Sequence, residues 1–480
     1  MREYQLFING EYRAATSGKV DECINPATGE VYARVHQANI EDAHLALDAA
    51  WDAFQSWKRI GPSEREKIIL NSAAVMRSHA QELVDILVDE AGSTLLKAGF
   101  EAHHTPEFLT GIAGECRRVM GDTYLSDYPG LQSYSIRRPK GVVLSIAPFN
   151  FPLLLSIRKV GWALAAGNTV ILKPSEATPV IGLKLAEIFK EAGMPDGVFN
   201  VLPAQAVDLG DTLIADPRVK KVTFTGSSRV GKLIAQTCGK YNKSVSLELG
   251  GKNPLIVLND ADLDYAVDAA AFSNYMHQGQ VCMTGSRVIV EAGVYDQFVE
   301  KVTRKVAGVK CGDPREPGVV VGPLIRDTQP AFIQTQIEAA VEAGAKVMTG
   351  GSYQANYFQP TVLANVTQDM SIFTTECFGP VASVIKAEDH KHAVELANDS
   401  EYGLSAAVIT NDLQKSMYMI EELETGMVHI NGPTIRDEPV VPFGGIKDSG
   451  MGREGGRYCM EEFTELKWVT IQSGQQHFPF

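Results

Sequence analysis

The sequence offers one carboxylate and one thiol whose surroundings suit covalent catalysis. Glu248 ends an apolar run and is followed by Gly250 and Gly251, and Cys282 comes later among small and polar residues. A cysteine attacks as the thiolate, but at its ordinary pKa of about 8.5 only a few per cent is ionised at neutral pH. A carboxylate whose pKa is raised by burial can act as a general base. The two residues therefore indicate a nucleophile and a base, although an inert buried thiol and a paired surface carboxylate are the simpler interpretations of each alone.

Further polar residues follow other apolar runs. The side-chain amide of Asn150 can donate a hydrogen bond or merely shape a turn. Lys173 and Glu176 can bind hydroxyl groups or form an exposed ion pair worth about 0–1 kcal/mol. The segment 226–232, GSSRVGK, nearly matches the phosphate loop of nucleotide hydrolases, but Leu233 stands where that motif requires Ser or Thr. What remains is a glycine turn at a helix start, which is either a plain connection or a phosphate site.

The elements that must position these residues are short apolar strands alternating with amphipathic helices. The strands expected after Lys140 are GVVLSIAP, NTVILKP, GVFNVLP, KVTFTGS, SVSLELG and NPLIVLN. This alternation predicts a doubly wound parallel sheet, in which ligands bind beyond the carboxyl ends of the strands. The polar residues named above fall at those ends. A second strand and helix series begins after Lys252 and runs to MVHIN.

The N-terminal part has a different pattern. Asn9-Gly10 between two apolar segments predicts a β-hairpin with a two-residue turn. Apolar residues at three- and four-residue spacing predict helices over Glu41–Trp57 and Ser63–Gly92. Ser63 with Glu66 fits a capping box at the start of the second helix.

Composition restricts the class of protein. The 480 residues predict two or three structural units, and 45% apolar with 21% charged residues is typical of a globular protein. A formal charge of −14 argues against nucleic acid and against an anionic membrane surface as partners. Prolines interrupt the most apolar stretch, Val142–Ile157, so we expect no membrane span.

The cysteines and the N-terminus indicate the compartment. Seven scattered cysteines without a CxxC pair suit free thiols in a reducing compartment, and predict neither a disulfide framework nor a metal site. The first residues, MREYQLFINGEY, lack the apolar core of a secretory signal. We therefore expect a cytoplasmic enzyme.

Several segments together resemble the aldehyde dehydrogenase superfamily. LELGGKNP around Glu248 and GQVCMTGSR around Cys282 resemble its two signature segments. Further matches occur in the order of the family and are APFNFP (147–152), GNTVILKPSE (167–176), FTGS (224–227), ECFGP (376–380) and PFGGIKDSG (442–450). Seven motifs in order over some 300 residues make the catalytic interpretation of the thiol far stronger than its spacing does.

The resemblance implies an α/β fold with two doubly wound, Rossmann-like parallel-sheet domains and a small β oligomerisation element. The cofactor domain would comprise residues 1–117 and 140–250, and the catalytic domain residues 251–447. The oligomerisation element would comprise residues 118–139 and 448–480. The family also implies a homodimer or homotetramer.

The resemblance also implies residue roles. Cys282 would be the nucleophile, Glu248 the base that activates the hydrolytic water, and Asn150 would form the oxyanion hole with the backbone N–H of Cys282. The residues implied to bind the cofactor are Lys173, Glu176, Gly226, Ser227, Glu376 and Phe378. Because a carboxylate accepts from a free ribose hydroxyl and repels a 2′-phosphate, Glu176 favours NAD, with NADP possible. The activity implied is oxidation of a small-molecule aldehyde to its acid through a thioester.

Matching to the family places mainly apolar residues around the aldehyde: Phe151, Leu155, Arg158, Met276, Val281, Met283 and Ile435. Such a lining suits an aldehyde with an aromatic or alkyl body. The C-terminal passage resembles dehydrogenases of hydroxylated benzaldehydes. Arg158 could meet a phenolate, a carboxylate or a polar ring substituent, or could face solvent or an interface. A carboxylate-bearing semialdehyde such as succinic semialdehyde is the alternative substrate, and a non-catalytic binding protein is the alternative class.

Overall fold

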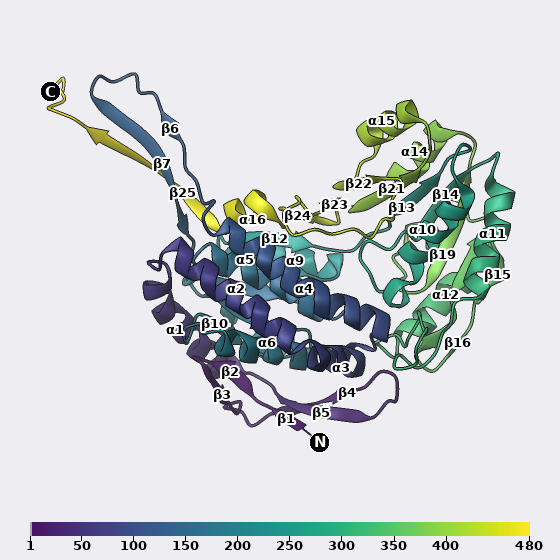
Figure 1. Cartoon of the computed structure of the whole chain (residues 1–480), viewed down its shortest axis with the longest axis horizontal. Coiled ribbons are helices and arrows are strands. Elements are labelled where there is room, and N and C mark those ends of the chain that lie inside the picture. The colour runs from purple at the N-terminus through teal and green to yellow at the C-terminus, as the bar shows by residue number, and fades with distance from the viewer. Residues whose placement is uncertain (1) are drawn as a thin grey trace.

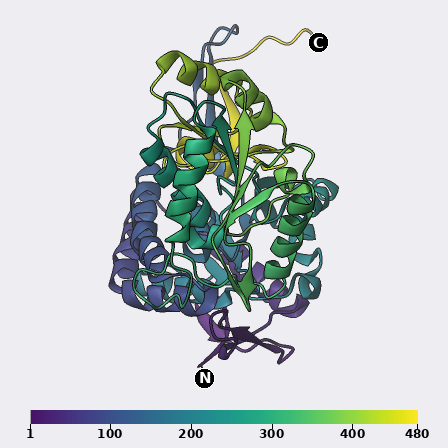
Figure 2. The same cartoon turned by 90° about the vertical axis from the view of Figure 1, so that its right-hand side faces the viewer.

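The computed structural model describes residues 2–480 as two α/β bodies and a projecting β arm (Figures 1 and 2). The first body contains an eight-stranded sheet in the order β24-β12-β11-β8-β9-β10-β2-β3. Its strands are β24 (Gly450–Met451), β12 (Ser244–Glu248), β11 (Val219–Thr225), β8 (Val142–Ile146), β9 (Thr169–Lys173), β10 (Phe199–Val201), β2 (Leu6–Ile8) and β3 (Glu11–Arg13). From β8 the chain proceeds through β9 to β10 on one side and then through β11 to β12 on the other, all parallel. The expected doubly wound sheet is confirmed.

Both faces of this sheet are covered, and its central strands β8, β9 and β11 are mainly apolar and buried at nearly every position. Val143 packs into the core on one face, while Val142 and Leu144 pack into the core on the other. The helices on the first face are α2 (Pro62–Ser78), α3 (Ala80–Ala91), α4 (Leu95–Glu115), α5 (Pro152–Ala165) and α6 (Pro179–Glu191). Those on the second face are α1 (Ile40–Trp57), α7 (Ala206–Leu209), α8 (Thr212–Ala215) and α9 (Ser228–Lys240). Continuous apolar strands of this kind are expected of a parallel sheet buried on both sides.

The second body contains a seven-stranded sheet in the order β15-β18-β19-β14-β13-β21-β22, with only β15 antiparallel. Its strands are β15 (Lys346–Thr349), β18 (Thr361–Ala364), β19 (Val381–Ala387), β14 (Arg287–Glu291), β13 (Pro254–Val257), β21 (Ser405–Ile409) and β22 (Met427–Ile430). The helices are α10 (Leu263–Tyr275), the short 3₁₀ turn η1 (Met276–Gly279), α11 (Tyr295–Ala307), α12 (Gln329–Glu342), α13 (Ser371–Thr374), α14 (His390–Asn398) and α15 (Leu413–Glu422). Two short two-stranded sheets complete the second body. One pairs β16 (Tyr353–Gln354) with β17 (Tyr357–Phe358), and the other pairs β20 (Tyr402–Gly403) with β23 (Ile446–Lys447). This is the second strand and helix series expected after Lys252.

The N-terminal hairpin forms as predicted. β2 and β3 pair antiparallel, and the turn residues Asn9 and Gly10 have φ of 53° and 78°. A separate three-stranded sheet of β1 (Arg2–Tyr4), β5 (Val31–His36) and β4 (Val20–Ile24) lies beside it.

The single helix predicted over Ser63–Gly92 is wrong, because the chain bends at His79 between α2 and α3. His79 makes ion pairs with Glu82 and Glu191, and the bend lets α3 pack against both α4 and α6. The capping box expected at Ser63 is also absent, since α2 begins after Gly61 without a side-chain cap. A capping box occurs instead on α1, between Asn39 and Asp42.

The arm is formed by segments far apart in sequence. β25 (Thr464–Gln472) pairs antiparallel along the whole of β7 (Leu131–Pro139), and β6 (Thr123–Tyr124) extends the sheet. Figure 1 shows this arm leaving the first body next to the C-terminal helix α16 (Gly456–Glu462). The short strand β24 belongs instead to the large sheet, where it pairs with β12. Across residues 2–480 no helix combines the length and apolar character that a membrane crossing requires.

Candidate active site

A cleft of about 600 Å³ lies at the carboxyl ends of the first sheet, with walls from both bodies. It is the ligand position that a doubly wound sheet predicts. Of the residues singled out in the sequence, it is lined by Asn150, Lys173, Glu176, Gly226, Ser227, Cys282, Glu376 and Phe378. The structure thus brings together motif residues that are separated by more than two hundred positions in the chain.

The loop that carries Cys282 is held by a residue to which sequence reasoning assigned no role. Asn253 donates from Nδ2 to the carbonyl oxygens of Cys282 and Thr284, at 2.8 and 2.9 Å. A Cβ on Gly251 would lie 2.5 Å from the Cys282 carbonyl, so glycine is required there for the close approach of the two segments. The signal for Asn253 was its place inside the LELGGKNP motif. Asn253 and Gly251 therefore fix the position of the thiol.

The surroundings of Cys282 and of Glu248 raise the pKa of both groups. Burial, with the nearby Glu248 and Glu376 carboxylates, raises the pKa of the Cys282 thiol to about 12. Burial also raises the pKa of Glu248 well above its usual range, and the negative charge of Glu454 adds to the effect. Glu248 Oε2 is buried without a hydrogen-bond partner in the protein. A carboxyl whose pKa is raised by burial has the increased affinity for protons that a general base requires.

Asn150 faces the thiol loop from the end of β8. Its Nδ2 donates to the carbonyl of Gln280 at 2.9 Å, which orients the side chain next to Cys282 in the cleft. A primary amide has two N–H groups, and this bond uses one. The other is available to an oxygen bound at the thiol.

The far part of the cleft carries the residues implied to bind a dinucleotide. Lys173 Nζ lies 2.6 Å from Glu176 Oε1 at the end of β9, and the Glu176 carboxylate is exposed to the cleft. Gly226 starts the turn after β11, and Ser227 caps α9 by accepting from the backbone N–H of Val230. Gly226, Ser227 and Val230 line the cleft, so the start of α9 lies where an anion at a helix N-terminus would bind.

Glu376 and Phe378 come from the second body. Glu376 Oε1 accepts from the backbone N–H of Gly251 at 3.0 Å, and burial raises the pKa of this carboxyl to about 7. A Cβ on Gly250 would lie 2.5 Å from the Glu376 carboxylate, so the glycine pair makes room for it. Phe378 packs edge-on against Phe149 at 5.8 Å between ring centroids.

The apolar residues expected around the substrate belong to one cluster. Phe151, Val281 and Met283 are buried in the core of the first body, and half-buried side chains pack against them. These half-buried members include Leu155, Met276, Cys282 and Ile435. Cys282 thus packs against the apolar core of the first body, to which these residues belong, but none of the seven residues expected around the substrate lines the cleft itself.

Arg158 differs from its neighbours. Its side chain is fully buried, and its NH1 and NH2 groups donate to the two oxygens of Asp437 at 2.5 and 2.7 Å. Nε also lies 3.3 Å from Glu454 Oε2. The guanidinium is therefore neutralised by carboxylates of the protein. This placement differs from the expectation of a free cation that meets a substrate anion, and from a solvent-facing arginine.

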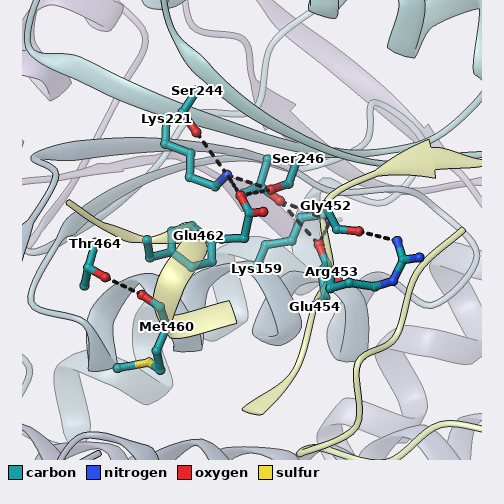
Figure 3. Close-up of polar contacts among 12 residues, drawn as sticks. Lys159, Lys221, Ser244, Ser246, Gly452, Arg453, Glu454, Met460, Glu462 and Thr464 are labelled. Carbon is teal, nitrogen blue, oxygen red and sulfur yellow. Dashed lines mark hydrogen bonds and ion pairs between the residues drawn. The ribbon is translucent and has the colours of Figure 1, made fainter. Parts of the chain in front are cut away.

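A network of charged side chains joins the C-terminal segment to the rest of the first body (Figure 3). Lys159 Nζ donates to Glu454 at 2.7 Å, and Lys221 Nζ pairs with Glu462 at 2.7 Å under β11 and β12. Both carboxylates come from the C-terminal segment, so the pairs fasten that segment to helix α5 through Lys159 and to strand β11 through Lys221. Nothing in the sequence near Glu454 indicated this role, because its partners lie almost three hundred positions away.

Comparison with known proteins identifies relatives over nearly the whole chain. The model of the aldehyde dehydrogenase family matches residues 12–469. A vanillin dehydrogenase from Pseudomonas fluorescens is 41% identical over the full length of both chains. A glutarate-semialdehyde dehydrogenase from Pseudomonas putida is 39% identical over 97% of each chain. The crystal structure of a salicylaldehyde dehydrogenase from Pseudomonas putida G7, complexed with salicylaldehyde, superposes with a TM-score of 0.98 at 37% identity over both whole chains.

The fold and the cleft define an α/β enzyme of the dinucleotide-dependent type. The chain belongs to the aldehyde dehydrogenase family.

Proposed function

We propose that this enzyme oxidises an aromatic aldehyde to its carboxylic acid with NAD as oxidant, through a thioester on Cys282. The observation that carries the proposal is that a thiol and an amide line the cleft together, with a buried carboxyl near the thiol. The Cys282 thiol and the Asn150 amide line it together, and the Glu248 carboxyl lies close enough to affect the pKa of that thiol.

Each group has a separate task. Cys282 loses its proton and attacks the aldehyde carbonyl carbon, and the resulting oxyanion accepts hydrogen bonds from Asn150 Nδ2 and the Cys282 backbone N–H. After oxidation to the thioester, Glu248 removes a proton from a water molecule, which attacks the acyl carbon and releases the acid. The unpartnered Glu248 Oε2 supports this assignment, since a buried acceptor needs a donor.

The cleft fits a nicotinamide dinucleotide, which supplies the hydride acceptor when bound. Lys173 and Glu176 would hold the adenosine ribose, and Gly226 with Ser227 at the α9 start would hold the pyrophosphate. Glu376 would hold the second ribose, with Phe378 near the ring. The close approaches at Gly250 and the cleft volume of about 600 Å³ support the fit.

The substrate class is supported by the packing of Cys282 against an apolar core and by the vanillin and salicylaldehyde dehydrogenases among the relatives. A carboxylate-bearing semialdehyde is the second candidate, favoured by the glutarate-semialdehyde relative. The pairing of Arg158 with Asp437 weighs against it, because that cation is already neutralised.

The proposed function is tested by following NADH formation with benzaldehyde, salicylaldehyde, vanillin and succinic semialdehyde, each with NAD and with NADP. We expect the aromatic aldehydes to have the highest kcat/KM. A higher value for succinic semialdehyde would assign the enzyme to the second class. Binding of NAD without turnover of any aldehyde would favour a non-catalytic binding protein.

Glu176→Gln is expected to lower kcat/KM with NAD and to raise the ratio of NADP to NAD use by on the order of tenfold. The reason is that the charged acceptor for the ribose hydroxyls, which also repels a 2′-phosphate, is removed. The ratio is measured at saturating aldehyde. Glu187→Gln is the matched control, because Glu187 is an exposed carboxylate of α6 paired with Lys184 outside the cleft. An unchanged ratio in Glu176→Gln would contradict the assignment.

We also propose that the arm joins subunits of a homodimer or homotetramer, and that residues 1–117 with 140–250 and residues 251–447 serve as cofactor and catalytic domains. Trp468 on β25 is 70% exposed and Leu466 on the same face is 51% exposed, which is unusual for large apolar side chains without a partner. The seven cysteines are all free thiols, which supports a reducing compartment such as the cytoplasm.

Trp468→Asp is expected to shift the protein toward the monomer in light scattering, since a charge would be buried in the proposed interface. Lys467→Ala alters the opposite face of the same strand and serves as the control. If light scattering gives both variants the molecular mass of the wild-type assembly, this face of the arm is not an interface.

A further inference from the structure

Glu101 is a buried carboxylate of α4 that has no role in the chemistry described above. Its side chain is 0% exposed, and Oε1 accepts hydrogen bonds from the backbone N–H groups of Leu153 and Leu154, each at 2.9 Å. These two donors lie in the first turn of α5, where N–H groups have no partner within the helix. Phe151, which precedes the helix, supplies no side-chain cap. Glu101 therefore caps α5 from a distant part of the chain.

The capped turn lies next to the amide proposed to stabilise the oxyanion. Asn150 stands two residues before Pro152, the first residue of α5. Its Nδ2 donates to the carbonyl of Gln280, which belongs to the loop that carries the thiol. Leu153 follows Asn150 by only three residues, so a displacement of the first turn of α5 moves the backbone of Asn150.

Lys97 balances the charge of Glu101. Its Nζ donates to Glu101 Oε2 and, at 3.1 Å, to Ser93 Oγ, and its side chain is 1% exposed. The same ammonium group lies 4.4 Å from the centroid of the Phe151 ring. The two carboxylate oxygens thus have separate partners, because Oε1 holds the start of α5 and Oε2 holds the lysine. A buried carboxylate without such a cation would be strongly destabilising.

The same segment of the first body also contacts the thiol loop. Gln278, four residues before Cys282, donates from Nε2 to the carbonyl of Gly92 at 3.0 Å. Gly92 ends α3 and lies directly before the start of α4. Residues 92–101 therefore contact the thiol loop at one end and the start of α5 at the other. A single element that holds both segments can fix the thiol and the amide relative to each other.

We propose that Glu101 is a positioning residue for aldehyde oxidation, which caps α5 and thereby holds the Asn150 amide where it stabilises the oxyanion formed at Cys282. This role rests on the proposed function and adds a residue to it. Glu101 acts through Asn150 and touches no reacting atom. Because the oxyanion exists only after attack on the aldehyde, misplacing its donor lowers kcat and leaves the binding of NAD unchanged.

Two double variants isolate the capping oxygen. Lys97→Met with Glu101→Gln keeps an acceptor oxygen at position 101, whereas Lys97→Met with Glu101→Leu removes it, and neither leaves an unpaired buried charge. We expect the Gln variant to keep kcat for benzaldehyde within about threefold of the wild type, and the Leu variant to lose about tenfold or more. The dissociation constant of NAD, measured by calorimetry, is expected to be that of the wild type in both.

A double-mutant cycle shows whether Glu101 acts through Asn150. Asn150→Ala removes the oxyanion donor, so the Leu variant should lower kcat by less than about twofold further in that background. If position 101 only supports the fold, the two losses multiply instead. Should the Leu variant not fold, Glu101→Asp takes its place in the same cycle, since it keeps the charge pair and only shortens the reach of the capping oxygen.

Glu90 provides the matched control. Its two oxygens accept from the backbone N–H groups of Val180 and Ile181 at 2.6 and 3.0 Å, so it caps α6 as Glu101 caps α5. It is equally buried, but α6 follows β9 and not the strand that leads to Asn150. Glu90→Leu and Glu90→Gln should therefore have the same kcat at saturating NAD. Thermal unfolding of all variants shows how far each lost cap destabilises the protein.

The role of Glu101 is overturned if the Gln and Leu variants have equal kcat, or if the Leu variant loses as much kcat in the Asn150→Ala background as in the wild type. An equal loss of kcat in Glu90→Leu, or a loss of NAD affinity that accompanies the loss of kcat, would also contradict it. Turnover of benzaldehyde by the wild type separates these results from a failure of the proposed function. If the wild type oxidises no aldehyde, the proposed function is wrong, and the role of Glu101 with it.

Discussion

Cys282→Ala is expected to lower kcat for aldehyde oxidation by on the order of 10⁴ to 10⁶, since the covalent route disappears with its nucleophile. NADH formation with benzaldehyde at saturating NAD measures the loss. Binding of NAD, followed by quenching of protein fluorescence, should persist, because the residues proposed to hold the cofactor are separate from the thiol. Loss of turnover with retained binding assigns Cys282 to the chemical step.

The chain offers a matched control for this substitution. Cys311 is the other half-buried free thiol of the structure, and its Sγ lies 3.6 Å from the Phe358 carbonyl, within the second body. Cys311→Ser should retain wild-type turnover. If Cys282→Ala kept its activity, or if Cys311→Ser lost it to the same extent, the assignment of the nucleophile would be wrong.

Glu248→Gln is expected to lower steady-state turnover by about 10² to 10⁴, the usual contribution of a general base. Because Glu248 is assigned to hydrolysis of the thioester, the first turnover should survive. Rapid mixing with aldehyde and NAD should then show a burst of about one NADH per active site, followed by a slow steady rate. A burst slowed as much as the steady rate would place Glu248 before thioester formation.

The pH dependence gives an independent signature of the same residue. Burial, together with Glu454, holds the pKa of Glu248 well above that of an ordinary carboxyl, so the basic form appears only as the pH rises. Turnover of the wild type should therefore increase with pH to a plateau, and Glu248→Gln should lose this limb. Glu291→Gln is the control, since Glu291 is a buried carboxylate that ends β14 in the second sheet and bonds the Asn259 backbone.

Local sequence patterns predicted the structure correctly where it depends on one contiguous stretch of the chain. The turn at Asn9-Gly10 needs only two residues with positive φ, and the parallel sheet follows from short apolar strands that cannot face water on either side. Where tertiary packing overrides the local pattern, the prediction from the local pattern was wrong. The periodic segment after Ser63 continues through His79 without a stop signal, and the bend there is made by contacts of α3 with α4 and α6.

The sequence by itself determined the family, the doubly wound sheet and the residue types at the strand ends, because motifs and periodicity are properties of contiguous residues. The tertiary structure alone decided what surrounds each side chain. It buried Arg158 between Asp437 and Glu454, and it moved the pKa values of Glu248 and Cys282 upward. Ion pairs and desolvation depend on groups hundreds of positions apart, so their effects exist only once the chain has folded.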